Sequence, residues 1–215
     1  MLENGCVVYH EYPDDVVSEL ISQRPERPID GIVISVSAKE LLSPNRQDRD
    51  RLVEWLYQEF RNVQQKVEFV LPVYLIISEM HELAGFQEFW ALEENRRFED
   101  DIFGWSSPYG SDIQFKNDWV DEAFNHVLAQ LRAQQLALTS KDKACRDEAL
   151  LSLGPALEDL RRPVNVLASD LLSPGVLAHS LIFRGIYFSG RIKANESNLF
   201  LKSLFDRKAR RNGFA

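Results

Sequence analysis

The closest approach to a phosphate-binding loop in this chain is the segment Gly185-Ile-Tyr-Phe-Ser-Gly-Arg-Ile192. A phosphate loop needs glycines that present backbone amides, a lysine that reaches the phosphates and a hydroxyl that binds magnesium. The segment has the glycine spacing only, because Arg191 replaces the lysine and Ile192 replaces the hydroxyl residue. Much of it is apolar and β-branched or aromatic, which indicates a buried strand that ends in a turn.

Histidines, cysteines and carboxylates give no stronger catalytic pattern. His81-Glu82 begins like the H-E-x-x-H motif of zinc peptidases, but Gly85 occupies the place of the second histidine. The four histidines lack ligand spacing, and no G-x-S-x-G or C-x-x-C sequence occurs. Eight acids could supply a carboxylate pair or a magnesium site, although a solvated helix surface explains them better: Glu79, Glu82, Glu88, Glu93, Glu94, Glu99, Asp100 and Asp101. We expect no catalytic residue, no metal and no cofactor.

Composition narrows the class of protein. The 215 residues are 45% apolar and carry 33 acids against 25 bases, a formal charge of −8. The apolar content disfavours disorder, and the net negative charge disfavours nucleic acid as the main ligand. Two distant cysteines exclude a disulfide scaffold, and no apolar run reaches the roughly 20 residues of a membrane span. Residues 191–211 hold seven bases and two acids, so this segment is +5 and the remainder is −13.

The first half of the chain alternates predicted strands and helices. We expect strands at residues 6–9, 31–36 and 70–78, a short helix from Pro13, and a long helix over 46–67. The long helix places its apolar side chains on one stripe, formed by Leu52, Leu56, Phe60, Val63 and Val67. Continuous β-branched runs are typical of strands covered on both faces, so a mostly parallel α/β sheet is predicted. Its central buried residues should be Ile34, Val36, Leu75 and Ile77.

The second half is predicted to be mainly helical. Expected helices cover residues 83–98, 118–138, 141–161 with a break or kink at Gly154-Pro155, and 163–180 with an interruption near residues 174–175. A loop is expected at 104–110, a strand at 181–188 and a basic helix at 199–211. The neighbours Phe86, Phe89 and Trp90 should belong to the core or, failing that, form a docking surface.

Six strings resemble the IcmF/TssM family, which provides the large inner-membrane component of type VI secretion systems and has a relative in type IVB secretion. The first is Arg24-Pro-Glu-Arg-Pro-Ile-Asp-Gly-Ile-Val-Ile-Ser-Val-Ser-Ala38, followed by Glu40-Leu-Leu42. The others follow in order over residues 71–77, 83–89, 104–109 with 119–122, 184–190 and 200–205, and the chain finishes in Gly213-Phe-Ala215. Together they span residues 24–215.

The resemblance implies the later portion of a GTPase-like (P-loop NTPase-like) core. Residues 1–105 would form that degenerate α/β core, 106–180 a helical extension, and 181–215 the last core strand with a basic C-terminal helix. The family's guanine-type T-K-x-D string would fall on Ser78-Glu-Met-His81. Glu79 replaces the lysine that covers the base and His81 replaces the aspartate that reads it. A phosphate loop would lie upstream of Met1, so we expect a vestigial nucleotide slot at Ser78, Glu79 and His81.

The same resemblance implies a structural role at the cytoplasmic face of the bacterial inner membrane. The full-length protein would be membrane-anchored, with this fragment soluble, and its partners would be a DotU/TssL-like inner-membrane protein and baseplate components. We expect partner binding at Glu93, Glu94 and Asp100. A membrane-proximal basic group is expected where bases are densest, at Arg207, Lys208, Arg210 and Arg211. One alternative is a nucleotide-hydrolysing domain whose phosphate loop lies upstream of this fragment. Another is a stand-alone adaptor without membrane helices, in which the basic segment would be an ordinary exposed helix.

Overall fold

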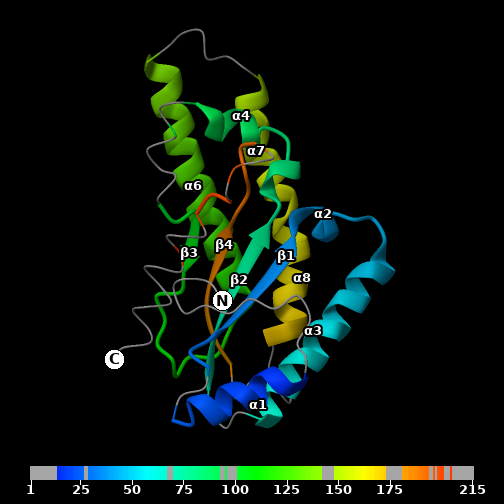
Figure 1. Ribbon diagram of the computed structural model, residues 1–215. Helices are drawn as coiled ribbons and strands as arrows, with labels where there is room; N and C mark the ends of the chain where they lie inside the picture. The colour runs from blue at the N-terminus through cyan, green and yellow to red at the C-terminus, as the bar shows by residue number, and fades with distance from the viewer. Residues whose placement is uncertain are drawn as a thin grey trace.

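The computed structural model centres on a four-stranded mixed sheet with the strand order β1-β2-β4-β3 (Figure 1). The strands are β1 (Ile32–Ser37), β2 (Leu71–Ser78), β3 (Gly104–Ser106) and β4 (Leu181–Phe188). The structure describes residues 14–26, 29–66, 70–92, 95, 101–141, 148–172, 181–193, 196, 198–200 and 204. The predicted strand at residues 6–9 lies outside these ranges.

Three of the four strands are parallel, as the sequence predicts. β1 pairs with β2 so that Ile34 lies opposite Leu75 and Val36 opposite Ile77. All four side chains are at most 5% exposed, which confirms their predicted place in the core. β4 then pairs in parallel with the other side of β2, whereas β3 runs antiparallel to β4.

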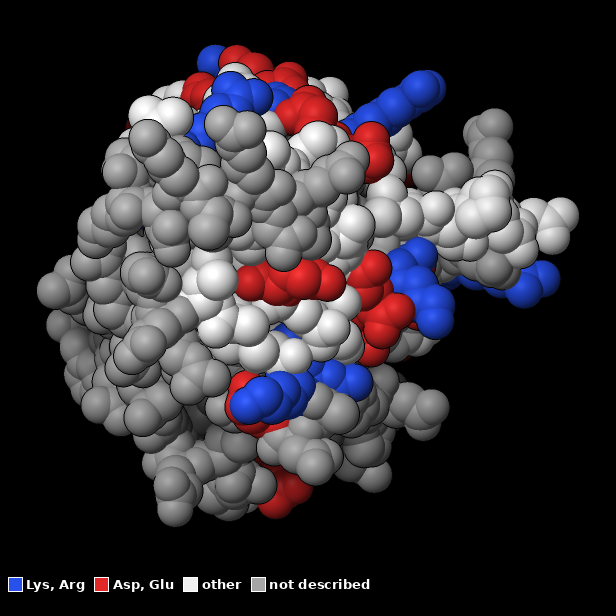
Figure 2. Space-filling view, turned by 90° about the horizontal axis from the view of Figure 1, so that it is seen from above, with Lys and Arg blue, Asp and Glu red and all other residues white. Residues whose placement is uncertain are grey.

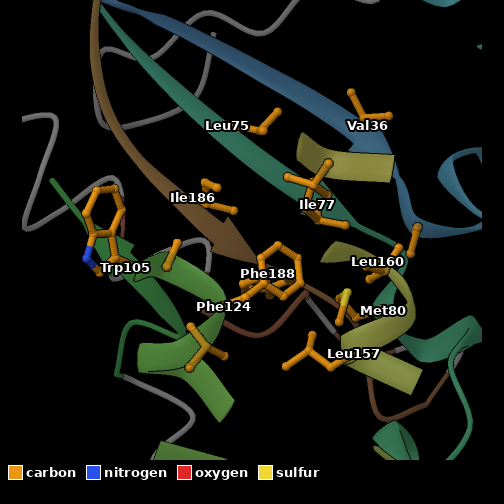
Figure 3. Close-up of a cluster of buried hydrophobic side chains, with 14 of the residues drawn as sticks. Val36, Leu75, Ile77, Met80, Trp105, Phe124, Leu157, Leu160, Ile186 and Phe188 are labelled. Atoms are coloured by element: carbon orange, nitrogen blue, oxygen red, sulfur yellow. The ribbon is translucent and has the colours of Figure 1, made fainter. Parts of the chain in front are cut away.

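The described helices build the main core against one face of the sheet. These helices are α3 (Arg46–Lys66), α4 (Phe86–Ala91), α6 (Asp118–Lys141), α7 (Glu148–Asp159) and α8 (Arg161–Leu172). Side chains of these helices and the inward-facing side chains of β1, β2 and β4 form the main core. Figure 3 shows part of this core, including Phe124 of α6 and Leu157 of α7. Three shorter helical elements complete the described part: α1 (Asp14–Gln23), α2 (Ala38–Leu41) and the 3₁₀ turn η1 (Met80–Glu82).

Four of the five residues of the predicted stripe on α3 pack as expected, and the fifth, Val67, lies outside the described residues. Leu56, Phe60 and Val63 are buried and Leu52 is partly buried against the main core. Val63 also meets Val17 of α1 at the lower end of the sheet, where the two helices lie side by side (Figure 1).

The predicted loop at residues 104–110 is wrong at its start, because Gly104–Ser106 forms β3. The pairing depends on two glycines. A Cβ on Gly185 would collide with the carbonyl oxygen of Trp105, and a Cβ on Gly104 would lie 2.5 Å from the carbonyl oxygen of Ile186. Local composition predicts a turn here, whereas the close contact with a distant strand makes this segment a strand.

Two helix predictions in the second half are corrected. The helix predicted over residues 83–98 begins at Phe86, after Gly85 adopts a left-handed conformation with φ 80°, and α4 ends at Ala91, where Leu92 is extended. Apart from Asn95, the rest of the predicted range lies outside the described residues. The predicted break at Gly154-Pro155 does not occur, since α7 continues through Pro155 to Asp159. Proline disfavours helical geometry in the residue before it partly through that residue's Cβ, and Gly154 has none. The interruption falls instead at Leu160, between α7 and α8.

The remaining second-half predictions agree where they can be compared. α6 extends the predicted 118–138 helix to Lys141, and β4 matches the predicted 181–188 strand. α8 begins at Arg161 and ends at Leu172, with residues 173–180 outside the described ranges. Most of the predicted basic helix at 199–211 is also outside them. None of the helices among the described residues is both long and apolar enough to cross a bilayer.

Candidate functional site at the carboxyl ends of the parallel strands

The predicted slot lies where β2 ends, beside the end of β1. Ser78 is the last residue of β2, and Glu79 follows in a left-handed conformation with φ 55° and ψ 33°. The hydroxyl of Ser37, at the end of β1, donates to Oε2 of Glu79 at 2.5 Å and accepts from the amide of Lys39 at 3.2 Å. Ser37 therefore caps α2 and joins the ends of two neighbouring strands.

His81 occupies the inner side of the slot. Its side chain is 9% exposed, and its Nε2 lies 3.7 Å from Oε1 of Glu82. Its buried Nδ1 has no hydrogen-bond partner among the described residues. The neighbouring Met80 is fully buried, so only Glu79 and Glu82 present carboxylates outward from this turn.

The chain leaving β4 crosses this same edge. The amide of Met80 donates to the carbonyl oxygen of Ser189 at 3.0 Å. The amide of Ser189 donates to the carbonyl oxygen of Ile77 at 2.9 Å. The Ser189 hydroxyl donates to the carbonyl oxygen of Leu199 at 3.0 Å. The Leu199 amide donates to the carbonyl oxygen of Gly190 at 2.7 Å. Ser189 is thus hydrogen-bonded both to the slot and to the segment that follows β4.

An aromatic cluster fills the space beside Ser189 and Gly190. A Cβ on Gly190 would lie 2.7 Å from the Phe86 ring and 3.0 Å from the His81 amide nitrogen, so the backbone touches α4 directly. Trp90 packs edge-on against Phe89, Phe103 and Phe200 at centroid distances of 4.9 to 5.4 Å. Phe86, Phe89 and Trp90 are at most 1% exposed, which confirms that they are core residues and not a docking surface.

Residues from three family-like segments, 104–109, 119–122 and 184–190, contact one another toward the other end of β4. The sequence analysis did not predict this contact. Tyr109 stacks on Trp119 with centroids 4.2 Å apart and donates its hydroxyl to Oε1 of Glu122 at 2.7 Å. This hydrogen bond raises the pKa of Tyr109. Arg184 donates to the carbonyl oxygen of Tyr109 at 3.3 Å. The Tyr109 hydroxyl, the Glu122 carboxylate and the Arg184 guanidinium each bond another group of the protein, so we interpret this cluster as structural.

Arg161 is a structural residue that the sequence analysis missed. Its guanidinium donates to Glu158 at 2.6 and 2.9 Å, to Oδ1 of Asp121 at 3.2 Å and to Oδ1 of Asn125 at 3.0 Å. It also lies 5.5 Å from the centroid of the Phe124 ring. The bond to Glu158 raises the pKa of Arg161. The spacing of Glu158 and Arg161 is compatible with an ion pair. The residues next to Arg161 in the sequence do not indicate that Asp121 and Asn125 of α6 would accept its other hydrogen bonds.

The predicted surface residues cannot be placed. Glu93, Glu94 and Asp100 lie outside the described residues, as does the basic group Arg207, Lys208, Arg210 and Arg211. The view from above looks onto the end of the molecule where β2 and β4 finish. It shows acidic side chains near the centre, basic ones below and to the right of them, and a mixed acidic and basic group at the top (Figure 2). Within the described ranges no three histidine, cysteine or acidic residues are grouped as metal ligands would be.

Comparison with known proteins gives one result for most of the chain. A family model described as the IcmF-related N-terminal domain matches residues 14–211. No curated protein and no solved structure gives a significant match.

Proposed function

This chain belongs to the IcmF/TssM family, and we propose that it is an interaction module which docks partner proteins in a bacterial type VI secretion membrane complex. Membership of the family is consistent with a secretion component. The docking role is our proposal, and so is the assignment of the α/β sheet to a GTPase-like core that has lost nucleotide chemistry.

The packing at the carboxyl ends of the strands is the observation that supports this role most directly. Open α/β sheets bind ligands in the crevice outside these ends. Here the backbone at Ser189 and Gly190 crosses the edge and touches Phe86 and the His81 turn. The carboxylate of Glu79 is bonded to Ser37. A domain whose ligand edge is filled by its own chain can still serve as a rigid platform for other proteins.

By analogy with the family, the partners would be a DotU/TssL-like inner-membrane protein and baseplate components at the cytoplasmic face of the inner membrane. We propose the acidic residues Glu93, Glu94 and Asp100 as the docking surface. They belong to the part of the chain outside residues 191–211, whose net charge is −13. The basic residues near the end of the chain would instead meet anionic lipid headgroups, each contributing roughly 1 kcal/mol at the surface.

A capture experiment with the full-length protein tests the docking surface. Replacing Glu93, Glu94 and Asp100 together by lysine should weaken capture of the inner-membrane or baseplate partner. The control replaces Asp112, Asp159 and Asp170, which are exposed and distant in sequence, by lysine and so makes the same change in charge. Equal capture by both variants would place docking on another surface.

The alternative is nucleotide hydrolysis, which the parallel order of β1, β2 and β4 and the place of the slot at their carboxyl ends favour. Because the phosphate loop of the alternative would lie upstream of this fragment, calorimetric titration of the full-length protein with magnesium and GTP or ATP separates the two functions. We expect no saturable heat, whereas micromolar binding that is lost in Glu79→Ala would support the alternative.

A further inference from the structure

Two residues adopt a backbone conformation that their side chains disfavour. Glu79 and Phe200 are the non-glycine residues with positive φ in the described part of the chain, at 55° and 71°. Left-handed geometry is uncommon outside glycine, asparagine and aspartate, and a bulky side chain makes it costly. Such conformations persist only where surrounding contacts impose them.

The two residues lie at opposite ends of one short hydrogen-bonded path. Leu199, adjacent to Phe200, bonds Ser189 and Gly190 through its carbonyl oxygen and its amide. The carbonyl oxygen of Ser189 accepts from Met80, the residue after Glu79. Glu79 and Phe200 are 121 positions apart in sequence, but this hydrogen-bonded path connects them through Ser189.

Aromatic packing provides a second connection between the same two turns. The ring of Phe200 lies 4.9 Å from Trp90 and 5.5 Å from Phe103, centroid to centroid. Trp90 belongs to α4, whose first residue, Phe86, abuts Gly190. Phe200 is 4% exposed, so its ring completes this cluster.

We propose that Glu79, Met80, Ser189, Leu199 and Phe200 form a conformational coupling unit, in which the seating of Phe200 imposes the left-handed turn at Glu79. When Phe200 leaves the aromatic cluster, the hydrogen bonds of Leu199 to Ser189 and Gly190 lose their support and the Glu79 turn relaxes. A displacement of the segment after β4 is thereby transmitted to the slot between β1 and β2. This inference does not depend on the identity of any docking partner.

Hydrogen exchange on the 215-residue chain measures the coupling. In Phe200→Ala, the Met80 and Glu82 amides should exchange about tenfold faster than in the unmodified chain, when each rate is divided by that of the Val164 amide in α8. A change of about tenfold is expected when about one hydrogen bond is lost. Val164 donates to the carbonyl oxygen of Leu160 and provides an internal reference for global opening.

Phe115→Ala is the matched control, because Phe115 is also buried in the main core but contacts Trp119 and Phe183 at the other end of β4. It should leave the ratio of Met80 to Val164 exchange unchanged. If Phe200→Ala accelerates Leu199 alone, or changes Met80 no more than Phe115→Ala does, the two turns are independent and the proposal fails.

A milder variant covers the case in which Phe200→Ala does not fold. Ser189→Ala keeps every ring and removes only the hydroxyl that bonds the carbonyl oxygen of Leu199. Faster exchange at both Leu199 and Met80 would support the coupling unit, whereas a change confined to Leu199 would overturn it.

Discussion

The parallel side of the sheet and its antiparallel edge are built on different principles. On the parallel side, α3 and its neighbours bury the side chains of β1 and β2 that face the main core. The other face of β1 is not covered as its apolar run predicts, because Val33 is 38% exposed. At the edge, β3 has three residues and exists because Gly104 and Gly185 allow two backbones to approach. The first region follows from local hydrophobic pattern, and the second follows from a fit between distant segments.

The largest expected effect lies on the parallel side. Leu75→Ala should lower the free energy of unfolding by about 2–5 kcal/mol, because it leaves a cavity between β2 and the helices. Urea denaturation followed by circular dichroism measures the change. The control is Leu151→Ala, since Leu151 is 55% exposed and its loss should cost less than about 0.5 kcal/mol. Similar values for the two variants would contradict the assigned core.

The edge should be sensitive to an added methyl group. Gly185→Ala should destabilise the chain by about 1–3 kcal/mol, since the new Cβ would collide with the Trp105 carbonyl and force β3 away. Gly110→Ala is the control, because there the Cβ would meet only the end of the Asp112 side chain. Should Gly185→Ala be as stable as the parent in the same urea assay, the close pairing of β3 and β4 would be wrong.

The helices that support the edge depend on Arg161. Arg161→Ala should cost about 1–2 kcal/mol, because it removes hydrogen bonds to Glu158, Asp121 and Asn125 from a side chain that is 21% exposed. The adjacent and exposed Arg162→Ala should have almost no effect on thermal unfolding. Equal melting temperatures for the two variants would show that the α6–α8 contact does not need the guanidinium.

The smallest effect appears only at high pH, where β3 and β4 meet. Burial raises the pKa of Tyr187 to about 12, with the hydrogen bond to Ser106 opposing the shift. The unfolded chain loses this proton near pH 10. The stabilising contribution is therefore complete below pH 10 and is lost as pH rises toward 12. In Tyr187→Phe, stability should fall less steeply over this interval, and identical slopes would mean that Tyr187 titrates normally.

Sequence pattern predicted the parallel strands and α6 well, because their apolar residues repeat at the spacing of one secondary structure. The pattern failed where contacts between segments distant in sequence determine the secondary structure. The residues around Gly104-Trp-Ser106 do not distinguish this segment from a loop. A proline is ordinarily expected to break a helix, and the sequence does not indicate that Gly154 permits α7 to continue through Pro155. The position of the slot at Ser78 and Glu79 was predictable from the end of an apolar run.

What the sequence could not predict at the slot is its environment. The bond between Ser37 and Glu79 joins residues 42 positions apart, and the bond from Met80 to Ser189 spans 109 positions. Neither partner is marked by its neighbours in the chain. The left-handed conformations of Glu79 and Phe200 were equally hidden, because both residue types ordinarily avoid them.

The place of β4 in the sheet has a consequence for synthesis on the ribosome. Leu71 pairs with Leu181, so β2 emerges 110 residues before its partner. At 5–20 residues per second, this interval lasts roughly 5 to 20 seconds. Throughout it, the side of β2 that will pair with β4 has exposed amides and carbonyls and apolar side chains, features that favour aggregation. The nascent chain is therefore most vulnerable while α6, α7 and α8 are being made, and it is protected once β4 docks.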